Sequence, residues 1–170
     1  MARCIAIVGM NGAGKTNFGK RLASKLGMLF SDTDALFEKT HGNTHKFIEE
    51  HGWDAYRKEE ETIVLGALEA DHVVILSGGA VESPTVRARL KERAVVLWIQ
   101  AHAKRIHEHL KRAKVARPEF ADGIHREKVD SMLETRNPLY KEVANILLFP
   151  STPFARQIPV ALTELKKFLK

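Results

Sequence analysis

The chain contains one cysteine among its 170 residues, Cys4, and therefore cannot form an internal disulfide bond. It also lacks any apolar run that approaches the roughly 20 residues required by a membrane-spanning helix. Apolar residues nevertheless make up 44% of the chain and charged residues 28%, a balance ordinary for soluble globular proteins. The first predicted strand begins at Cys4, so we expect no signal peptide and no membrane partner, and we assign the protein to the cytoplasm.

Internal repeats and low-complexity tracts are absent as well, which excludes a solenoid or a long disordered linker. The length suits one domain with a hydrophobic core and is too short for two such domains. We therefore expect a single domain over residues 1–170 that acts as a monomer.

Positive charge is in excess, with 27 Lys and Arg residues against 21 Asp and Glu residues, but it is unevenly distributed. Residues 101–117 carry six basic residues and one acidic residue, whereas residues 48–61 carry six acidic and two basic residues. A basic segment can attract anionic ligands, including nucleic acid. No aromatic platform or recognition motif accompanies this segment, so we interpret it mostly as a solvated helix face and expect no nucleic-acid partner.

The sequence GMNGAGKT at residues 9–16 matches the phosphate-loop pattern G-x-x-x-x-G-K-[ST] at every fixed position. It follows an apolar run at residues 4–8 and precedes residues 17–26, whose apolar side chains have helical spacing. Backbone N–H groups of such a loop and helix N-terminus can face a phosphate. Lys15 can reach the β- and γ-phosphates of a nucleotide, and Thr16 can offer its hydroxyl to Mg²⁺. The alternative is a plain glycine-rich turn, and the motif in this setting favours nucleotide binding.

Strand-like and helix-like segments alternate along the chain. The predicted strands are residues 4–8, 28–30, 73–76, 94–99 and 146–149. The predicted helices are residues 17–26, 35–40, 44–51, 54–70, 84–91, 102–113 and 126–143, with a last helix from residue 154 or 155. Because Asn137 precedes a proline, the helix over 126–143 is expected to have a kink or boundary there. The alternation predicts an α/β fold with one parallel sheet covered on both faces.

Two acidic residues, Asp32 and Asp34, follow the second predicted strand. That place is the ligand-binding edge of an open α/β sheet, and two residues so spaced on an extended chain point to the same side. A metal or substrate role is favoured, although Thr33 or Asp34 could instead cap the next helix. The third predicted strand ends at Ser77, where phosphate-loop nucleotidases usually have an aspartate that helps to hold Mg²⁺. Asp32 is therefore the candidate acid for the metal.

Six motifs occur in one order along nearly the whole chain. They are GMNGAGKT at residues 9–16, DTD at 32–34, YR at 56–57, SGGA at 77–80, RP at 117–118 and RNPLY at 136–140. This set closely resembles that of the shikimate kinases, a branch of the nucleoside-monophosphate-kinase-like proteins. The phosphate loop is shared by many families, whereas the other elements together are much more specific. The resemblance implies a three-layer P-loop kinase fold with strand order 2-3-1-4-5, substrate-binding helices over about 33–61 and a mobile lid over about 112–125.

The resemblance also implies a reaction, in which the γ-phosphate of ATP passes to the 3-hydroxyl of shikimate in aromatic amino-acid biosynthesis. ATP and shikimate are then the partners, and Mg²⁺ is the cofactor. Lys15 and Thr16 resemble the residues that bind phosphate and metal, and Asp32 the acid that holds the metal through water. Asp34 resembles the residue that hydrogen-bonds the accepting hydroxyl and takes its proton. Arg117 resembles the lid arginine that closes on the phosphates.

On the acceptor side, Arg57 and Arg136 resemble the pair that grips the substrate carboxylate, which a guanidinium fork binds well. The turn over the substrate ring is then formed by Gly78, Gly79 and Ala80. Considered alone, Arg57 is equally explained as a salt-bridge partner of Glu60 or Glu61 at helical spacing. The nucleotide-binding residues implied by the resemblance are Gly12, Ala13, Gly14, Lys15, Thr16, Arg112, Arg117 and Pro153.

Four positions depart from the family pattern. Ala80 replaces a glycine and is expected to crowd the acceptor or to shift the loop slightly, and residues 119–120 are Glu-Phe where the family lid has two leucines. Leu110 occupies the position of an adenine-stacking arginine, for which Lys111 or Arg112 could substitute. These departures keep open a related kinase with a gluconate-like or aminoshikimate-like acceptor. The basic segment keeps open a third class, a non-catalytic ligand sensor or nucleic-acid binder on the same fold.

Overall fold

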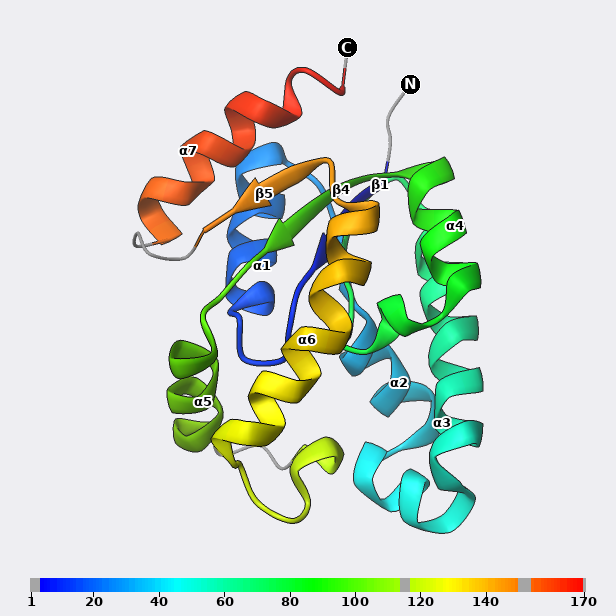
Figure 1. Ribbon diagram of the computed structural model, residues 1–170. Helices are drawn as coiled ribbons and strands as arrows, with labels where there is room; N and C mark the ends of the chain where they lie inside the picture. Colours follow the sequence, from blue (N-terminus) through cyan, green and yellow to red (C-terminus); the bar gives the residue numbers. More distant parts are fainter. Residues whose placement is uncertain (1–3, 114–116, 150–153, 170) are drawn as a thin grey trace.

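The computed structural model describes residues 4–113, 117–149 and 154–169 of the chain. A parallel sheet lies at its centre (Figure 1). The sheet has five strands in the order β2-β3-β1-β4-β5. The strands are β1 (Cys4–Val8), β2 (Phe30–Asp32), β3 (Val73–Ile75), β4 (Ala94–Ile99) and β5 (Ile146–Leu148). This confirms the predicted sheet and its strand order.

Helices cover both faces of the sheet (Figure 1). They are α1 (Lys15–Leu26), α2 (Thr33–His41), α3 (Thr44–Ala67), α4 (Pro84–Arg93), α5 (Ala103–Arg112), α6 (Arg126–Val143) and α7 (Phe154–Leu165), with 3-10 turns η1 (Ala80–Glu82) and η2 (Pro118–Phe120). Within the described part of the chain, no helix is both long enough and apolar enough to cross a membrane.

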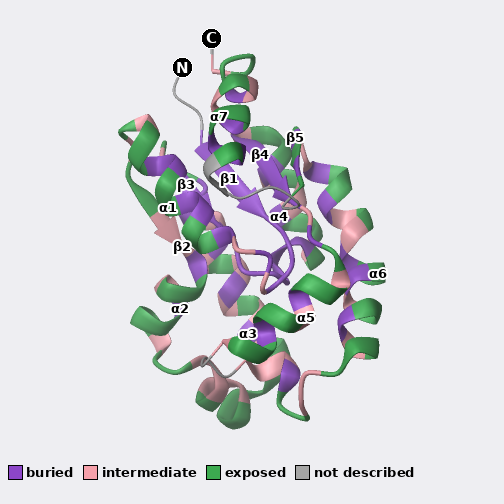
Figure 2. Cartoon of the chain, turned by 90° about the vertical axis from the view of Figure 1, so that its left-hand side faces the viewer, coloured by how far each residue is buried: buried purple, intermediate pink, exposed green. Residues whose placement is uncertain are grey.

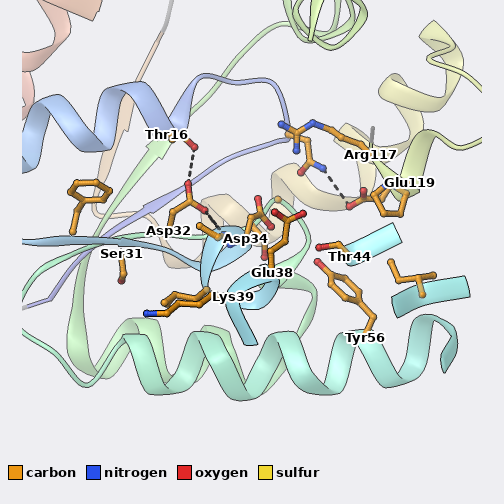
Figure 3. A pocket seen from close by; sticks show the side chains of 18 of the residues that line it. Thr16, Ser31, Asp32, Asp34, Glu38, Lys39, Thr44, Tyr56, Arg117 and Glu119 are labelled. Atoms are coloured by element: carbon orange, nitrogen blue, oxygen red, sulfur yellow. Dashed lines mark hydrogen bonds between the residues drawn. The ribbon is translucent and has the colours of Figure 1, made fainter. Parts of the chain in front are cut away.

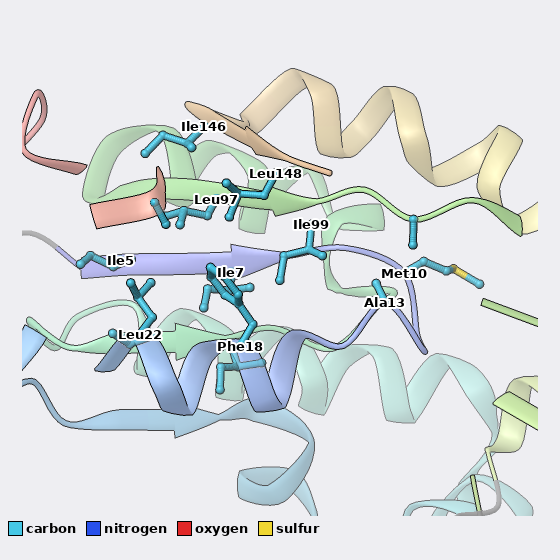
Figure 4. Close-up of a cluster of buried hydrophobic side chains, with 14 of the residues drawn as sticks. Ile5, Ile7, Met10, Ala13, Phe18, Leu22, Leu97, Ile99, Ile146 and Leu148 are labelled. Carbon is cyan, nitrogen blue, oxygen red and sulfur yellow. The ribbon is translucent and has the colours of Figure 1, made fainter. Parts of the chain in front are cut away.

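The central strands are buried on both faces, as Figure 2 shows, because their side chains alternate between two hydrophobic clusters. Ile5 and Ile7 of β1 point to the cluster shared with α1 and α7, which Figure 4 shows around Phe18 and Leu22. The neighbouring β1 residues point to the opposite cluster, which α3, α4 and the end of α6 complete. An unbroken apolar run therefore becomes a strand that is covered on both sides.

The edge strand β2 begins two residues later than predicted. Phe30, Ser31 and Asp32 pair with β3, whereas Leu29 precedes the strand and is 84% exposed. An edge strand is paired on one side only, so its apolar residues need not be buried, and the apolar pattern of residues 28–30 did not locate its bounds. The shift places Asp32 at the last position of the strand and Asp34 within α2.

The boundary expected at Asn137 is wrong, because α6 runs without interruption through Pro138. Pro138 lies on the exposed side of the helix, and so does Glu134, whose carbonyl loses its helical donor and can be hydrated there. Arg136 and Tyr140 on the opposite side are buried. Packing of that side against the protein keeps the helix continuous despite the proline.

In α3, by contrast, the break predicted near Gly52 is present. Gly52 has left-handed, non-helical dihedral angles (φ 85°, ψ 167°) inside the span of α3. The second part of α3 then carries Tyr56, Arg57 and Glu60 toward the carboxyl ends of β1, β2 and β3. At this edge of the sheet the phosphate loop, Asp32 and Ser77 meet, as expected for parallel strands.

Candidate active site

The phosphate loop, residues 9–16, joins β1 to α1 and leaves the first turn of α1 without a side-chain cap. Gly14 at the N-cap position has φ 91°, and Gly12 has φ 82°, angles that glycine adopts without steric strain. Because no side chain occupies the first-turn N–H groups, they are available to an anion, which the helix dipole also favours. The loop can therefore receive a phosphate group.

Lys15 lies at the base of this loop with only 9% of its surface exposed. Its Nζ donates a hydrogen bond to the Met10 carbonyl oxygen at 3.1 Å. Desolvation lowers the pKa of the ammonium group to about 8, opposed mainly by the Asp34 carboxylate and assisted by Arg117. A buried ammonium group that lacks full compensation is well suited to attract phosphate oxygens.

Thr16 and Asp32 face each other across the edge of the sheet (Figure 3). The Thr16 hydroxyl donates to Asp32 Oδ2 at 2.9 Å, while Asp32 Oδ1 accepts from the backbone N–H of Asp34 at 3.0 Å. Asp32 is therefore the N-cap of α2, a role for which Thr33 or Asp34 was the alternative offered by the sequence, and it faces the phosphate loop at the same time. Thr16 and Asp32 together offer hard oxygen ligands to a divalent cation.

Asp34 lies in the first turn of α2 rather than on the extended chain assumed from the sequence. Its side chain is exposed to the cavity, and charged groups of the site surround it. Desolvation by the walls of the cavity raises the pKa of the Asp34 carboxyl group to about 6, the Asp32 carboxylate adds to the increase, and Lys15 and Arg117 oppose it. Such a pKa suits a group that accepts a proton near neutral pH.

Two neighbouring cavities open at this edge of the sheet. The larger has a volume of about 560 Å³ and extends between α2, α3 and the η2 segment (Figure 3). The smaller has a volume of about 140 Å³ and is lined mainly by the phosphate loop. The side chains common to both are Asn11, Thr16, Asp32, Asp34 and Arg117. The site thus has two compartments, with Asp34 and Arg117 between them.

Arg57 of α3 and Arg136 of α6, here called the arginine pair, are linked through Glu82 at the end of η1. Arg136 Nε donates to Glu82 Oε1 at 2.7 Å, and Arg57 Nη2 lies 3.7 Å from Glu82 Oε2. Arg57 Nη1 also contacts Glu60 Oε2 at 2.7 Å, so the salt bridge considered from helical spacing is present too. A Cβ atom on Gly79 would lie 2.7 Å from Arg57 Cζ, so glycine is required there for the guanidinium group to approach.

Glu60 makes more contacts in the site than the sequence predicted, since helical spacing indicated only an ion pair with Arg57. It is buried, and besides Arg57 its carboxylate accepts hydrogen bonds from Tyr56 Oη at 2.9 Å and Ser77 Oγ at 2.6 Å. Ser77 is held in turn because its backbone N–H donates to Thr33 Oγ1 at 2.9 Å. The residue that replaces the usual metal-binding aspartate therefore anchors the wall of the larger cavity.

The comparison with known proteins decides the family. The family model described as Shikimate kinase matches residues 11–158 of the chain. The chain belongs to the shikimate kinase family. It is similar to the shikimate kinase of Actinobacillus pleuropneumoniae, with 34% identity over 166 residues that cover 96% of this chain and 95% of that protein. It is also similar to the shikimate kinase of Mycobacterium leprae, with 39% identity over 150 residues, 86% of this chain and 73% of that protein.

A solved structure agrees with this shikimate kinase assignment. The shikimate kinase from Acinetobacter baumannii in complex with shikimate is 27% identical to the chain, with a TM-score of 0.84. The match covers 100% of this chain and 96% of that one. The resemblance inferred from six short motifs is therefore confirmed at the level of family and fold.

In this shikimate kinase family member, only some of the residues predicted to bind the nucleotide line the phosphate-loop cavity. Gly12, Gly14, Lys15, Thr16 and Arg117 do so, whereas Arg112 does not. Arg112 is exposed and lines a third cavity, of about 530 Å³, which shares His109 with the phosphate-loop cavity. Leu110 packs against Gly12, where an added Cβ atom would lie 3.0 Å from Leu110 Cγ, and is buried. Pro153 lies outside the described residues.

The departures from the shikimate kinase pattern have different consequences. Ala80 is buried in the cluster that α3 and α4 complete and does not line the larger cavity. The expectation that its methyl group crowds the acceptor is therefore wrong. Glu119 lines the larger cavity, and its Oε1 accepts a hydrogen bond from Asn11 Nδ2 at 3.3 Å. Phe120 is buried in the opposite cluster. The lid segment, in its described part, therefore contacts the phosphate loop through a carboxylate.

Proposed function

We propose that this shikimate kinase family member transfers the γ-phosphate of ATP to the 3-hydroxyl of shikimate, releasing ADP and shikimate 3-phosphate. One observation carries the proposal: Asp34 lines both cavities, between a loop suited to phosphate and a larger cavity whose wall includes Tyr56 and Gly78. The arginine pair does not line that cavity itself but lies behind this wall, where Arg57 contacts Gly79. A nucleotide phosphate on one side and a small carboxylic-acid alcohol on the other would meet at Asp34. We also propose that the protein acts as a monomer in the cytoplasm.

On the donor side, the N–H groups of residues 12–16 surround the phosphates, and Lys15 neutralises the β- and γ-phosphate oxygens. Arg117 supports the same task, because its Nε is buried and has no hydrogen-bond partner among the described residues. A guanidinium group at this position can stabilise charge on the transferred phosphoryl group.

The residues present fit a divalent cation, which we take to be Mg²⁺. The Thr16 hydroxyl and the Asp32 carboxylate supply two hard oxygen atoms 2.9 Å apart. In the described part of the chain, no group of three or more His, Cys, Asp or Glu side chains could hold a metal on its own. Phosphate oxygens and water would complete the coordination, which is how Mg²⁺ is usually bound beside nucleotides. When bound, the ion would neutralise phosphate charge.

On the acceptor side, the arginine pair binds the carboxylate and Asp34 accepts a hydrogen bond from the reacting hydroxyl. The hydroxyl oxygen forms a bond to the γ-phosphorus atom while the bond between that atom and the β–γ bridging oxygen breaks. The hydroxyl proton passes to Asp34, and ADP leaves with the electron pair of the broken bond. Residues 117–119 line the larger cavity, and their closure over a bound acceptor would keep water out.

The direct test is release of ADP by the purified protein with shikimate and Mg-ATP. We expect turnover above the ATP-only blank, and a folded sample without it would overturn the proposal.

Lys15→Met is expected to reduce kcat by about a thousandfold or more because it removes the main cation on the phosphates. Arg136→Ala is expected to raise the KM for shikimate by about 30-fold or more with a smaller effect on the KM for ATP. Unchanged kinetics of Arg136→Ala would refute the carboxylate role.

A further inference from the structure

We propose that the Glu82 carboxylate occupies the position that the acceptor carboxylate takes between Arg57 and Arg136. Glu82 is therefore a built-in competitor that sets the affinity of the enzyme for its acceptor. The identity of the acceptor rests on the proposed function, whereas the competition itself rests on the geometry of Glu82. No motif in the sequence had singled out this residue.

The contacts of Glu82 are those of a bound carboxylate. Each of its two oxygens faces a different member of the arginine pair, Oε1 at 2.7 Å from Arg136 Nε and Oε2 at 3.7 Å from Arg57 Nη2. Arg136 is 3% exposed, and its Nη1 contacts the Met10 sulfur at 3.5 Å, a weak acceptor for a guanidinium group. Glu82 thus supplies the anion that this buried cation requires while no acceptor is bound.

The local charge balance shows why Glu82 and an acceptor carboxylate compete. Two guanidinium groups, Arg57 and Arg136, are matched by two carboxylates, Glu60 and Glu82. A third carboxylate would give this partly buried group a net negative charge, which is unfavourable at low dielectric. One of the two glutamates must therefore withdraw when the acceptor binds.

Glu82 is the one that can withdraw. The Glu60 side chain is 6% exposed and is held by Tyr56, Arg57 and Ser77. The Glu82 side chain is 37% exposed, and its described side-chain contacts are the arginine pair alone. Its side chain can rotate into solvent while its backbone stays in place, since its N–H donates to the Gly79 carbonyl oxygen at 3.0 Å.

A purely structural ion pair is the alternative explanation of Glu82. If Glu82 only positioned Arg136, its replacement would loosen Arg136 and weaken acceptor binding. If Glu82 competes, its replacement frees the arginine pair and strengthens acceptor binding. The two explanations therefore predict changes of opposite sign.

The experiment measures the dissociation constant of shikimate by calorimetric titration for the wild type, Glu82→Gln and Glu82→Asp. If the carboxylate occupies the arginine pair nine-tenths of the time, removing it tightens binding about tenfold. Glu82→Asp keeps the charge but is one methylene shorter and cannot reach both arginines, so a smaller gain is expected. It also carries the test if Glu82→Gln fails to fold. Equal or weaker binding by whichever folded variant is measured would overturn the proposal.

Two controls separate competition from a general charge effect. Glu92→Gln on α4 makes the same charge change at an exposed residue that pairs with Arg89, and we expect the wild-type dissociation constant. In an Arg136→Ala background, where half of the arginine pair is missing, Glu82→Gln is expected to change the constant less than twofold. A tenfold gain in that background would attribute the effect to the net charge of the cavity and overturn the proposal.

A second ligand distinguishes failure of this inference from failure of the proposed function. Cyclohex-1-ene-carboxylate has a planar carboxylate but no hydroxyl, so its binding, followed by chemical-shift titration, does not depend on phosphoryl transfer. Tighter binding of this probe by Glu82→Gln, together with no turnover of shikimate by the wild type, would reject the proposed substrate and support competition. Turnover of shikimate by the wild type, with no tighter binding of the probe by Glu82→Gln, would support the proposed substrate and reject competition.

Discussion

At the scale of single residues, the site holds two ionisable groups whose protonation is shifted toward neutrality. Burial lowers the pKa of Lys15 to about 8, and desolvation by the walls of the cavity together with the Asp32 carboxylate raises that of Asp34 to about 6. Each group opposes the shift of the other, which indicates that their charges interact across the phosphate position. Asp34 must be deprotonated to accept a proton, and Lys15 must stay protonated to remain a cation. Both conditions hold together only between about pH 6 and pH 8.

This window predicts a bell-shaped pH dependence of kcat/KM. Below about pH 6 the Asp34 carboxyl group is protonated in the free enzyme and cannot accept the hydroxyl proton. Above about pH 8 Lys15 loses the proton that makes it attractive to phosphate. We expect kcat/KM to be highest between these values and to fall on both sides, measured by ADP release with the coupling enzymes in excess. An acid limb near pH 4 would contradict the role of Asp34.

The same shift predicts that Asp34 destabilises the folded protein at neutral pH. Its pKa is about 6 when folded and 3.8 when unfolded, so the folded state binds the proton more tightly. The stabilising contribution of the protonated group is complete below about pH 4 and is lost as pH rises through about 6. Asp34→Asn should therefore melt at a higher temperature than the wild type at pH 7.5, with a narrower difference at pH 5. Differential scanning fluorimetry checks this, and a lower melting temperature at pH 7.5 would contradict it.

At the scale of elements, α6 controls the turn that follows β3. The hydroxyl of Tyr140 on α6 donates to the Gly78 carbonyl oxygen at 2.6 Å, and Tyr140 is fully buried. Gly79, the next residue, lies against the Arg57 guanidinium group. A helix that begins near the lid therefore fixes the turn on which the acceptor is expected to rest.

Tyr140→Phe is the variant that tests this link. It removes one buried hydrogen bond and leaves the Gly78 carbonyl oxygen without that donor, so we expect a loss of about 1–3 kcal/mol in unfolding free energy. The KM for shikimate should rise more than the KM for ATP, because the turn touches the phosphate loop at Asn11 and not at the phosphate-facing residues 12–16. Thr135→Ala is the control, since it removes an exposed hydroxyl from the same helix that bonds the Ser131 carbonyl oxygen. Equal stability of Tyr140→Phe and the control would refute the link.

At the scale of the whole molecule, the site gathers segments from both layers of the fold. The phosphate loop belongs to the side covered by α1 and α7, whereas Arg57 comes from α3 on the other side. Ligands that contact both sides bind the folded state only, so they should stabilise the whole domain.

We therefore expect the melting temperature to rise when nucleotide is added. At a concentration of 100 times the dissociation constant, Mg-ADP should contribute about 2.7 kcal/mol, or about 5–10 °C for a domain of this size. Lys15→Met should lose most of that shift because it removes the principal phosphate contact. Adding shikimate together with Mg-ADP should raise the temperature further. An equal nucleotide shift in Lys15→Met would contradict the assignment of Lys15.

The sequence by itself determined the sheet, the phosphate loop and the family. Unbroken apolar runs can be satisfied only by strands covered on both faces, and a glycine loop before a helix has few other structural explanations. These features depend on neighbours in the chain, so their pattern can be recognised without the fold. The metal candidate Asp32 was also found this way, because it lies at the carboxyl end of a strand, at the ligand-binding edge of the sheet.

Only the tertiary structure decided which charges meet. Glu82 and Arg136 are separated by 54 positions, yet their side chains form an ion pair of 2.7 Å. No local pattern encodes such a contact, because it depends on how α3, α6 and η1 pack together. Continuity of α6 through Pro138 likewise follows from burial of Arg136 and Tyr140, which outweighs the local preference of a proline. Helical spacing had offered Glu60 as a partner of Arg57, whereas Glu82 was identified only once the helices were assembled on the sheet.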